Sequence, residues 1–228
     1  MPVPAQPKIY HIIHVDRLAS IIADGSLWSD AVMVQRQGVG TTIGMSNIKA
    51  RRLNELSLSC HPDLRVGHCT PFYFCPRSVM LYLIYRRSEE LAYKGGQEPI
   101  VHLEADLHAT IAWAQQNNQR WAFTLSNAGT YYFEDRSDVA KLSNINWDAV
   151  QARQWGFAIR QRRQAGGIPD RALVSLALGG AHRSLFARHR VLRGERYTRR
   201  GAPSANRNNA RLVGNSNDRI PDRRYFQG

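Results

Sequence analysis

The sequence lacks the features that mark several large classes of protein. Its 228 residues include three cysteines, an odd number that cannot form a complete disulfide framework. No apolar run approaches the roughly 20 residues of a membrane span, and the N-terminus has no basic-then-apolar signal pattern. No GxGxxG turn follows an expected strand, so a Rossmann site is not supported. These absences predict a cytoplasmic protein with no membrane partner.

Lysine is absent after Lys141, and the composition changes near residue 160. Residues 1–160 hold 12 Arg and 4 Lys against 14 acidic residues, a net charge of +2. Residues 161–228 hold 15 Arg against 4 acidic residues, a net charge of +11. The formal charge of +13 therefore says little about the partners of the first part. We predict an organised domain over residues 1–160, followed by a poorly ordered, Arg-rich basic tail over residues 161–228.

The hydrophobic pattern of the first part predicts strands and helices without a regular alternation. Expected strands cover residues 9–13, 71–75, 99–103, 121–125 and 131–133, and expected helices cover residues 15–24, 48–56, 76–87, 106–116 and 147–155. Residues 29–47 and 57–69 are expected to be loops. This mixture favours the α+β class with a mainly antiparallel sheet.

Cysteine and histidine residues gather in the middle of the chain, at Cys60-His61, His68-Cys69 and Cys75. Neighbouring side chains in an extended segment point to opposite faces, so two adjacent pairs are poor ligands for one tetrahedral zinc ion. Cys75 lies in an apolar strand, where free cysteine commonly belongs to the core. We therefore predict no metal site, and a Cys/His zinc protein that touches nucleic acid stays an alternative.

A second group of polar residues begins with His11 and His14 at the end of the first expected strand. A Gly-, Ser- and Thr-rich loop follows, and "IKARR" (48–52) then places adjacent cations on a short helix. A structural histidine and a solvated helix face are the alternatives for these residues taken singly. Together they can cradle a dinucleotide, because guanidinium groups bind phosphate in a bidentate manner.

Several long segments, in this order, resemble the DarT family of DNA ADP-ribosyltransferase toxins over roughly residues 7–157. The matching segments are "IYHIIHVDRLASIIADGSLWSD" (9–30), "IGMSNIKARR" (43–52), "TPFYFCPRSVMLYLIY" (70–85), "GGQEPIVHLEADL" (95–107) and "WDAVQARQW" (147–155). The resemblance implies an ADP-ribosyltransferase fold, in which a split, mainly antiparallel sheet holds NAD, the co-substrate, in its cleft. It also implies transfer of ADP-ribose to thymine bases of single-stranded DNA. The implied partner is a macrodomain antitoxin, DarG, which reverses the mark.

The resemblance also implies roles for single residues. The family's His-Ile-Thr segment, which contacts NAD, corresponds here to His11, Ile12 and Ile13, so the threonine hydroxyl is missing while the backbone groups remain. Further NAD contacts of the family fall on Ser20 and Trp28.

The catalytic arginine of the family matches Arg51, a cation that can hold NAD and stabilise charge on the thymine ring. Asn127 stands where some relatives carry a histidine at the start of the DNA-facing loop.

The catalytic glutamate that the family would imply is missing. Breaking the nicotinamide–ribose bond builds an oxocarbenium-like centre, which calls for a positioned carboxylate. The family carries a segment like Gln-Ala-Glu-Phe-Leu after the 147–155 helix, whereas residues 164–168 here read Gln-Ala-Gly-Gly-Ile. The expected Glu is thus absent near Gly167, and we expect the chain to be impaired.

A shift of reading frame explains both the missing glutamate and the unusual tail. The codons permitted from Ala165 to Ala181, read from the second base of Ala165, allow Gln-Ala-Glu-Phe-Leu-Ile-Glu-Arg-Leu-Phe-Pro-Trp-Arg-Leu-Val-Glu-Arg. This recovers the family's C-terminal motifs in order. We therefore interpret the chain from about residue 157 as out-of-frame translation of a family member. A true basic DNA-binding arm is the alternative, although the tail has few interleaved aromatic residues.

Two further classes of function compete with the Cys/His zinc protein at this point. The first is an NAD-dependent DNA ADP-ribosyltransferase, impaired in this chain. The second is a non-catalytic protein whose cleft binds NAD or single-stranded DNA without turnover.

Overall fold

The computed structural model describes residues 2–37 and 40–151 and, beyond them, the backbone of five short strands. Those strands are β8 (Ser175–Gly179), β9 (Arg190–Arg193), β10 (Arg196–Tyr197), β11 (Pro203–Ser204) and β12 (Ala210–Leu212). Among the described residues, none of the helices combines the length and apolarity that crossing a membrane requires.

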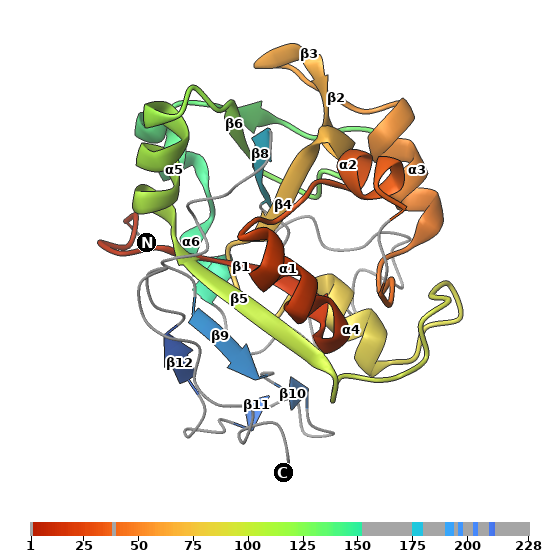
Figure 1. Ribbon diagram of the computed structural model, residues 1–228. Helices are drawn as coiled ribbons and strands as arrows, with labels where there is room; N and C mark the ends of the chain where they lie inside the picture. The colour runs from red at the N-terminus through yellow and green to blue at the C-terminus, as the bar shows by residue number, and fades with distance from the viewer. Residues whose placement is uncertain are drawn as a thin grey trace, which may run out of the picture.

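One large antiparallel sheet dominates the fold (Figure 1). Its strands lie in the order β12-β9-β5-β1-β4-β8-β6-β7, and each neighbouring pair is antiparallel. The strands not yet defined are β1 (Lys8–His14), β4 (Cys69–Tyr73), β5 (Ile100–Asp106), β6 (Trp121–Thr124) and β7 (Asp135–Arg136). The predicted α+β class with a mainly antiparallel sheet is confirmed.

The sheet is divided between β1 and β4. Strand β1 pairs with β5 at seven positions, from Lys8↔Asp106 to His14↔Ile100. Against β4, its described pairing is limited to Tyr10↔Tyr73. The two strands therefore diverge on either side of this contact, which gives the split sheet that the family resemblance implied.

Strand β8 lies inside the sheet, although its sequence belongs to the tail. It pairs with β4 from Cys69↔Gly179 to Tyr73↔Ser175 and with β6 on its other side. Backbone groups need partners whatever the side chains are, and "SLALG" is apolar enough to form a strand. Together with β9 and β12 at the other edge, β8 makes three strands of the sheet from tail sequence. The expectation of poor packing concerns residues that lie mostly outside the described ones.

Helices cover the sheet and complete the domain. They are η1 (Val15–Arg17), α1 (Leu18–Asp24), α2 (Asp30–Gln35), α3 (Ser46–Asn54), η2 (Val66–His68), α4 (Val79–Tyr85), α5 (Leu107–Gln116), η3 (Val139–Asn144) and α6 (Trp147–Gln151). Figure 1 shows α2 and α3 together at one corner of the molecule and α5 at the opposite edge.

Local signals explain where several helices begin and end. Helix α1 ends at Gly25, whose φ of 60° is left-handed and suits a residue without Cβ. Asp106 caps α5 by accepting a hydrogen bond from the Ala109 amide, in agreement with the expected start of this helix at residue 106. Helix α4 begins at Val79, because Ser78 caps it and accepts from the Leu81 amide. The prediction that this helix starts at residue 76 was therefore wrong by one turn.

Three other expectations were also wrong. The expected loop over residues 29–47 contains helix α2, and the loop over residues 57–69 contains a hairpin of β2 (Ser57–Leu58) and β3 (His61–Arg65). Residues 131–133 are not a strand, since β7 begins at Asp135. The expected helix over residues 147–155 is described as far as Gln151, and its remainder lies outside the described residues.

The core lies between the sheet and the helices on its flank. Ile9, Phe72, Leu103 and Phe123, one from each of four central strands, are fully buried in it. Trp147 of α6 packs edge-on against Phe74 at 5.5 Å, and its indole donates to the Leu142 carbonyl. This core holds the divided sheet in place around the gap beside β1.

Candidate functional site

A cavity of about 580 Å³ opens beside the divided part of the sheet, within the range of roughly 300–1,000 Å³ typical of ligand pockets. Strand β1, helices α1, α2 and α3, the segment before α3 and strand β4 all contribute to its walls. The residues expected to contact NAD that line this cavity are His11, Ile12, Ile13, Ser20 and Trp28.

His11 bridges the divided strands. Its Nδ1 lies 2.7 Å from the Pro71 carbonyl oxygen, and because a carbonyl only accepts, Nδ1 carries a proton. Burial lowers the pKa of His11, against the opposing effect of the Pro71 carbonyl, so the ring is neutral near pH 7. Its ring also packs on Phe72 at 5.6 Å. The result is a fixed, uncharged imidazole in the cavity wall.

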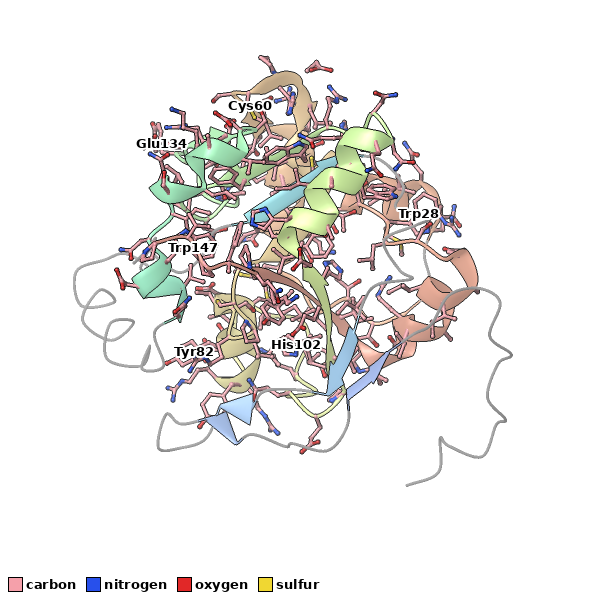
Figure 2. All side chains as sticks on the ribbon, turned by 90° about the vertical axis from the view of Figure 1, so that its left-hand side faces the viewer. Trp28, Cys60, Tyr82, His102, Glu134 and Trp147 are labelled. Atoms are coloured by element: carbon pink, nitrogen blue, oxygen red, sulfur yellow. The ribbon has the colours of Figure 1, made fainter. Side chains whose placement is uncertain are left out.

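Trp28 presents an oriented aromatic surface to the same cavity (Figure 2). Its Nε1 donates to Asp24 Oδ2 at 2.7 Å. The Arg36 guanidinium donates to both carboxylate oxygens of Asp24 and lies 4.7 Å from the centre of the Trp28 ring. Three side chains thus fix one another, and the indole ring cannot turn without breaking a charge-assisted pair.

Ser20 lies on the exposed side of α1 at the cavity. Its hydroxyl donates to the Arg17 carbonyl oxygen at 2.9 Å, one helical turn earlier. The hydroxyl oxygen keeps its capacity to accept a hydrogen bond. Ser20 can therefore offer an acceptor to a ligand without losing its contact with the helix.

Helix α3 brings two cations to the cavity. Lys49 Nζ lies 2.7 Å from Asp30 Oδ1, and Arg52 Nη1 lies 3.6 Å from Asp30 Oδ2. Within the described part of the chain, the buried Nε of Arg52 has no hydrogen-bond partner. An unpaired guanidinium donor beside a cavity is suited to an anionic ligand.

Arg51 lies on a different side of α3 and is not among the cavity-lining residues. Its Nη1 donates to the Gly129 carbonyl oxygen at 3.0 Å, and its guanidinium carbon lies 4.3 Å from the centre of the Tyr131 ring. Adjacent residues on an α-helix point about 100° apart. Of the two adjacent arginines that the sequence grouped as a dinucleotide cradle, the structure therefore brings Arg52 to the cavity and directs Arg51, the one that the family resemblance singled out, to the loop between β6 and β7.

Asn127 organises that loop, residues 126–133. Its side-chain oxygen accepts from the Gly129 amide at 2.9 Å, and its backbone carbonyl accepts from both the amide and the hydroxyl of Thr130. Asn127 is therefore near Arg51 through Gly129, and it is not among the residues that line the cavity.

Among the described residues, two carboxylates line the cavity, and both already have cationic partners. Asp24 pairs with Arg36, and Asp30 pairs with Lys49. The position near Gly167, where the sequence lacks the expected glutamate, lies outside the described residues.

Neither acidic residue at the end of the 126–133 loop replaces that carboxylate at the cavity. Glu134 pairs with Arg136, and Figure 2 shows it on the opposite side of the molecule from Trp28. Asp135 is buried and accepts hydrogen bonds from the amides of Ser59 and Cys60. Its carboxylate fastens the β2–β3 hairpin to β7.

The cysteines do not form a metal centre in the part of the chain that the structure describes. Burial, followed by the contact with Asp135, raises the pKa of Cys60 to about 12. Burial likewise raises the pKa of Cys69 to about 12. Both are therefore neutral thiols near pH 7, and neither has the thiolate character that zinc binding or nucleophilic chemistry requires.

Sequence reasoning missed a clasp that closes one side of the cavity. Asp16 accepts from the amide and hydroxyl of Thr41, at 3.0 and 2.7 Å. Arg17 donates to the carbonyl oxygens of Gly40 and Thr41. These contacts join residues more than 20 positions apart in the chain, and no local pattern announces them. The clasp holds the segment before α3 against the start of α1.

Comparisons with known proteins agree with this arrangement. The family model described as "ssDNA thymidine ADP-ribosyltransferase, DarT" matches residues 10–166. A DNA ADP-ribosyl transferase from Thermus sp. (strain 2.9) is 32% identical over 164 residues, which cover 71% of this chain and 74% of the relative.

Solved structures of similar proteins lead to the same family. Thermus sp. 2.9 DarT in complex with ADP-ribosylated ssDNA superposes with a TM-score of 0.66 at 28% identity, over 82% of this chain and 80% of that one. The same protein in complex with NAD+ gives a TM-score of 0.63 at 25% identity, over 87% and 85% of the two chains.

Proposed function

The chain belongs to the DarT family of DNA ADP-ribosyltransferases, and we propose that its cavity binds NAD as the co-substrate for modifying thymine bases in single-stranded DNA. The observation that carries the proposal is the cavity at the division of the sheet, with His11–Ile13 on one wall and the unpaired Arg52 Nε on another. One relative of known structure, Thermus sp. 2.9 DarT, holds NAD+ in one complex and ADP-ribosylated ssDNA in another.

The residues of the cavity fit a dinucleotide. Lys49 and Arg52 offer positive charge for its phosphates, and Arg52 has an N–H that lacks a partner among the described residues. The Trp28 ring offers a fixed aromatic surface, and neutral His11 adds no charge beside it. NAD supplies the ADP-ribosyl group, with nicotinamide as the leaving group.

The chain's own residues account for binding and orientation more fully than for acid–base chemistry. His11 donates its Nδ1 proton in a hydrogen bond to the Pro71 carbonyl oxygen, and the carboxylates of Asp24 and Asp30 form ion pairs with cationic side chains. No cavity-lining carboxylate among the described residues is left unpaired to assist proton removal from thymine. We infer that this chain binds NAD but transfers ADP-ribose slowly.

One experiment tests the function and the impairment together. Radiolabelled NAD is incubated with thymine-containing and thymine-free single-stranded oligonucleotides, using this chain and a version whose reading frame is restored from codon 165. Loss of an acid–base group typically costs about 10²–10⁴ in rate, so the restored version should transfer label faster by at least that factor, and only to thymine-containing DNA. Equal transfer by both versions would show that the shifted frame is not the cause of any impairment.

A non-catalytic role is the second candidate, favoured by the missing glutamate. It predicts that calorimetry detects NAD binding by this chain while neither version transfers label. The two candidate functions therefore differ in whether the restored version transfers label to DNA.

The toxin role and the antitoxin partner follow from the family and are also proposals. We expect the restored version to arrest growth when it is expressed alone in the bacterial cytoplasm. Co-expression of a macrodomain that removes ADP-ribose from thymidine should restore growth, whereas a macrodomain with a disabled active site should not. Growth arrest that an active macrodomain leaves unchanged would contradict this pairing.

A further inference from the structure

Three side chains in the cavity wall come from separate places in the chain and contact one another. Asp24 is the last residue of α1, Trp28 lies between α1 and α2, and Arg36 directly follows α2. All three line the cavity. We propose that Asp24 is a positioning residue for NAD binding, which holds the Trp28 ring in the orientation that a ring of the dinucleotide contacts, with Arg36 supporting it. This inference rests on the proposed binding of NAD in the cavity.

The backbone on both sides of Trp28 is fixed by helix caps. Gly25 ends α1 in the left-handed conformation, and Ser29 begins α2 by accepting a hydrogen bond from the Val32 amide. Leu27, next to Trp28, is buried in the core. Rotation of the Trp28 side chain is therefore the main freedom that its neighbours leave, and this rotation decides which face of the indole a ligand meets.

Asp24 restrains this rotation through hydrogen bonds. Its Oδ2 accepts from Trp28 Nε1 at 2.7 Å, and its two oxygens accept from Arg36 Nη2 at 2.9 and 3.0 Å. The Arg36 guanidinium carbon lies 4.7 Å from the centre of the Trp28 ring. Each of the three side chains thus contacts both of the others. Turning the indole would break a hydrogen bond to a carboxylate and a cation–π contact together.

The fixed indole suits an aromatic ligand. Arg36 covers one face of the half-buried Trp28 ring, so the other face is the one on which a ligand ring can stack. NAD contains two aromatic rings, those of adenine and nicotinamide, and aromatic rings pair favourably with one another. A side chain that is already oriented loses little freedom on binding, which favours the affinity by about two- to tenfold.

The negative charge of Asp24 acts in the opposite direction. The pyrophosphate of NAD is anionic, and a carboxylate in the same cavity repels it. If Asp24 acted through its charge alone, removing it would strengthen NAD binding and would release Arg36 to contact the ligand. If Asp24 positions Trp28, removing it weakens NAD binding. The two roles therefore predict changes of opposite sign.

The test measures the affinity of the full chain for NAD by calorimetry and compares Asp24→Ala with Asp24→Asn. Alanine leaves the indole without an acceptor and should weaken binding by about two- to tenfold. Asparagine keeps an oxygen that can accept from Nε1 while losing the charge, so its affinity should lie between those of the alanine variant and the wild type. Binding by Asp24→Ala that is as tight as that of the wild type, or tighter, would overturn the proposal.

The same substitution in a Trp28→Phe chain is the matched control. Phenylalanine keeps an aromatic ring but has no N–H for Asp24 to hold. In this background Asp24→Ala should not weaken NAD binding, and the loss of negative charge should leave it equal or slightly tighter. The effects of the two substitutions are then strongly non-additive. A loss of the same size in both backgrounds would show that Asp24 does not act through Trp28.

The indole N–H resonance of Trp28 reports the hydrogen bond directly. The chain contains five tryptophans, and the proton–nitrogen NMR signal that disappears in Trp28→Phe identifies this one. The signal should move upfield in Asp24→Ala, because the hydrogen bond to a carboxylate is lost, and it should shift when NAD is added to the wild type. An unchanged signal in Asp24→Ala, or one that does not respond to NAD, would contradict the proposed role.

Failure of this inference can be distinguished from failure of the proposed function. A wild-type chain that does not bind NAD would remove the function and the inference together. A wild-type chain that binds NAD no more tightly than Asp24→Ala would remove the positioning role alone.

If thermal unfolding shows that Asp24→Ala does not fold, Arg36→Ala decides the question, because the Arg36 side chain is largely exposed. Arg36→Ala should weaken NAD binding more in the wild type than in Trp28→Phe, since part of its effect passes through the indole. Equal losses in the two backgrounds would overturn the proposal.

Discussion

The two sides of helix α3 present opposite kinds of surface. Toward the cavity, Lys49 and Arg52 flank Asp30, and the Arg52 Nε has no partner among the described residues. Toward the 126–133 loop, Arg51 is already engaged by the Gly129 carbonyl and the Tyr131 ring. One side therefore has a buried donor without a partner among the described residues, while the other uses its donor to hold protein.

This difference assigns separate tasks to two adjacent arginines. A guanidinium with an unpaired N–H can bind a phosphate directly, whereas one that already stacks on an aromatic ring acts by positioning the residues that it contacts. In this chain Arg52 is therefore placed to contact a ligand in the cavity, whereas Arg51 holds the 126–133 loop.

The largest expected effect comes from Arg52→Ala. Losing a charge-assisted hydrogen bond costs about 1.5–3 kcal/mol, so calorimetry should show NAD binding about 10- to 100-fold weaker. The matched control, Arg51→Ala, should keep its NAD affinity within about threefold, because its side chain does not line the cavity. The opposite ranking of the two variants would return the dinucleotide contact to Arg51, as the family resemblance implied.

A smaller effect is expected from a pair of glycine substitutions, one on each side of α3. A Cβ at Gly129 would lie 2.9 Å from Ile48 Cγ2 and 3.2 Å from Asn127 Oδ1, so Gly129→Ala must displace the loop. A Cβ at Gly44 would lie 2.8 Å from Lys49 Cε, on the cavity side.

Gly129→Ala should weaken oligothymidine binding several-fold and leave NAD affinity unchanged. Gly44→Ala should do the reverse, and by less, because the end of a lysine side chain moves easily. Anisotropy and calorimetry on both variants measure the two affinities. Equal losses of both ligands in each variant would mean that the two sides of α3 are not independent.

The family resemblance, rather than the hydrophobic pattern, assigned His11–Ile13 and Trp28 to one site. The structure brings these residues together at one cavity, and their contact with NAD stays a prediction. Which of Arg51 and Arg52 points inward depends on how α3 docks on the sheet. Docking is a tertiary property, and a rotation of one residue exchanges the two side chains.

Helix α2 and the clasp of Asp16 and Arg17 on Thr41 were not predicted, for a related reason. Helix α2 has only six residues, and its apolar residues 31–34 are consecutive, so the segment is too short to show a helical period. The clasp of Asp16 and Arg17 on Thr41 joins distant segments. Strand β8 shows the opposite case, since backbone pairing can place a segment in a sheet without the side chains that the family resemblance implied there.

The smallest expected effect is a difference in how pH changes the stability of the two sides of helix α3, the cavity side and the loop side. On the cavity side, burial lowers the pKa of His11 below its usual value. The folded state therefore binds fewer protons than the unfolded state below about pH 6.5, and stability falls as pH drops through that value.

On the loop side, burial would raise the pKa of Asp135, but the hydrogen bonds from Cys60 and Ser59 outweigh it, and the pKa is lowered. Its contribution is present above the unfolded pKa, near 3.8, and is lost only as pH falls through the lower folded value. As pH falls, the cavity side should therefore lose stability at a higher pH than the loop side does.

Urea unfolding between about pH 7 and about pH 5 checks this order. The wild type should lose stability over this range, and His11→Gln should lose less, because its side chain does not titrate. Some slope should remain in His11→Gln, since burial lowers the pKa of His102 to about 4. Asp135→Asn should be less stable than the wild type by a similar amount at both pH values, because the native carboxylate is ionised at both. If Asp135→Asn removed the slope and His11→Gln kept it, the loop side would be the acid-sensitive one, and the contrast between the two sides would be reversed.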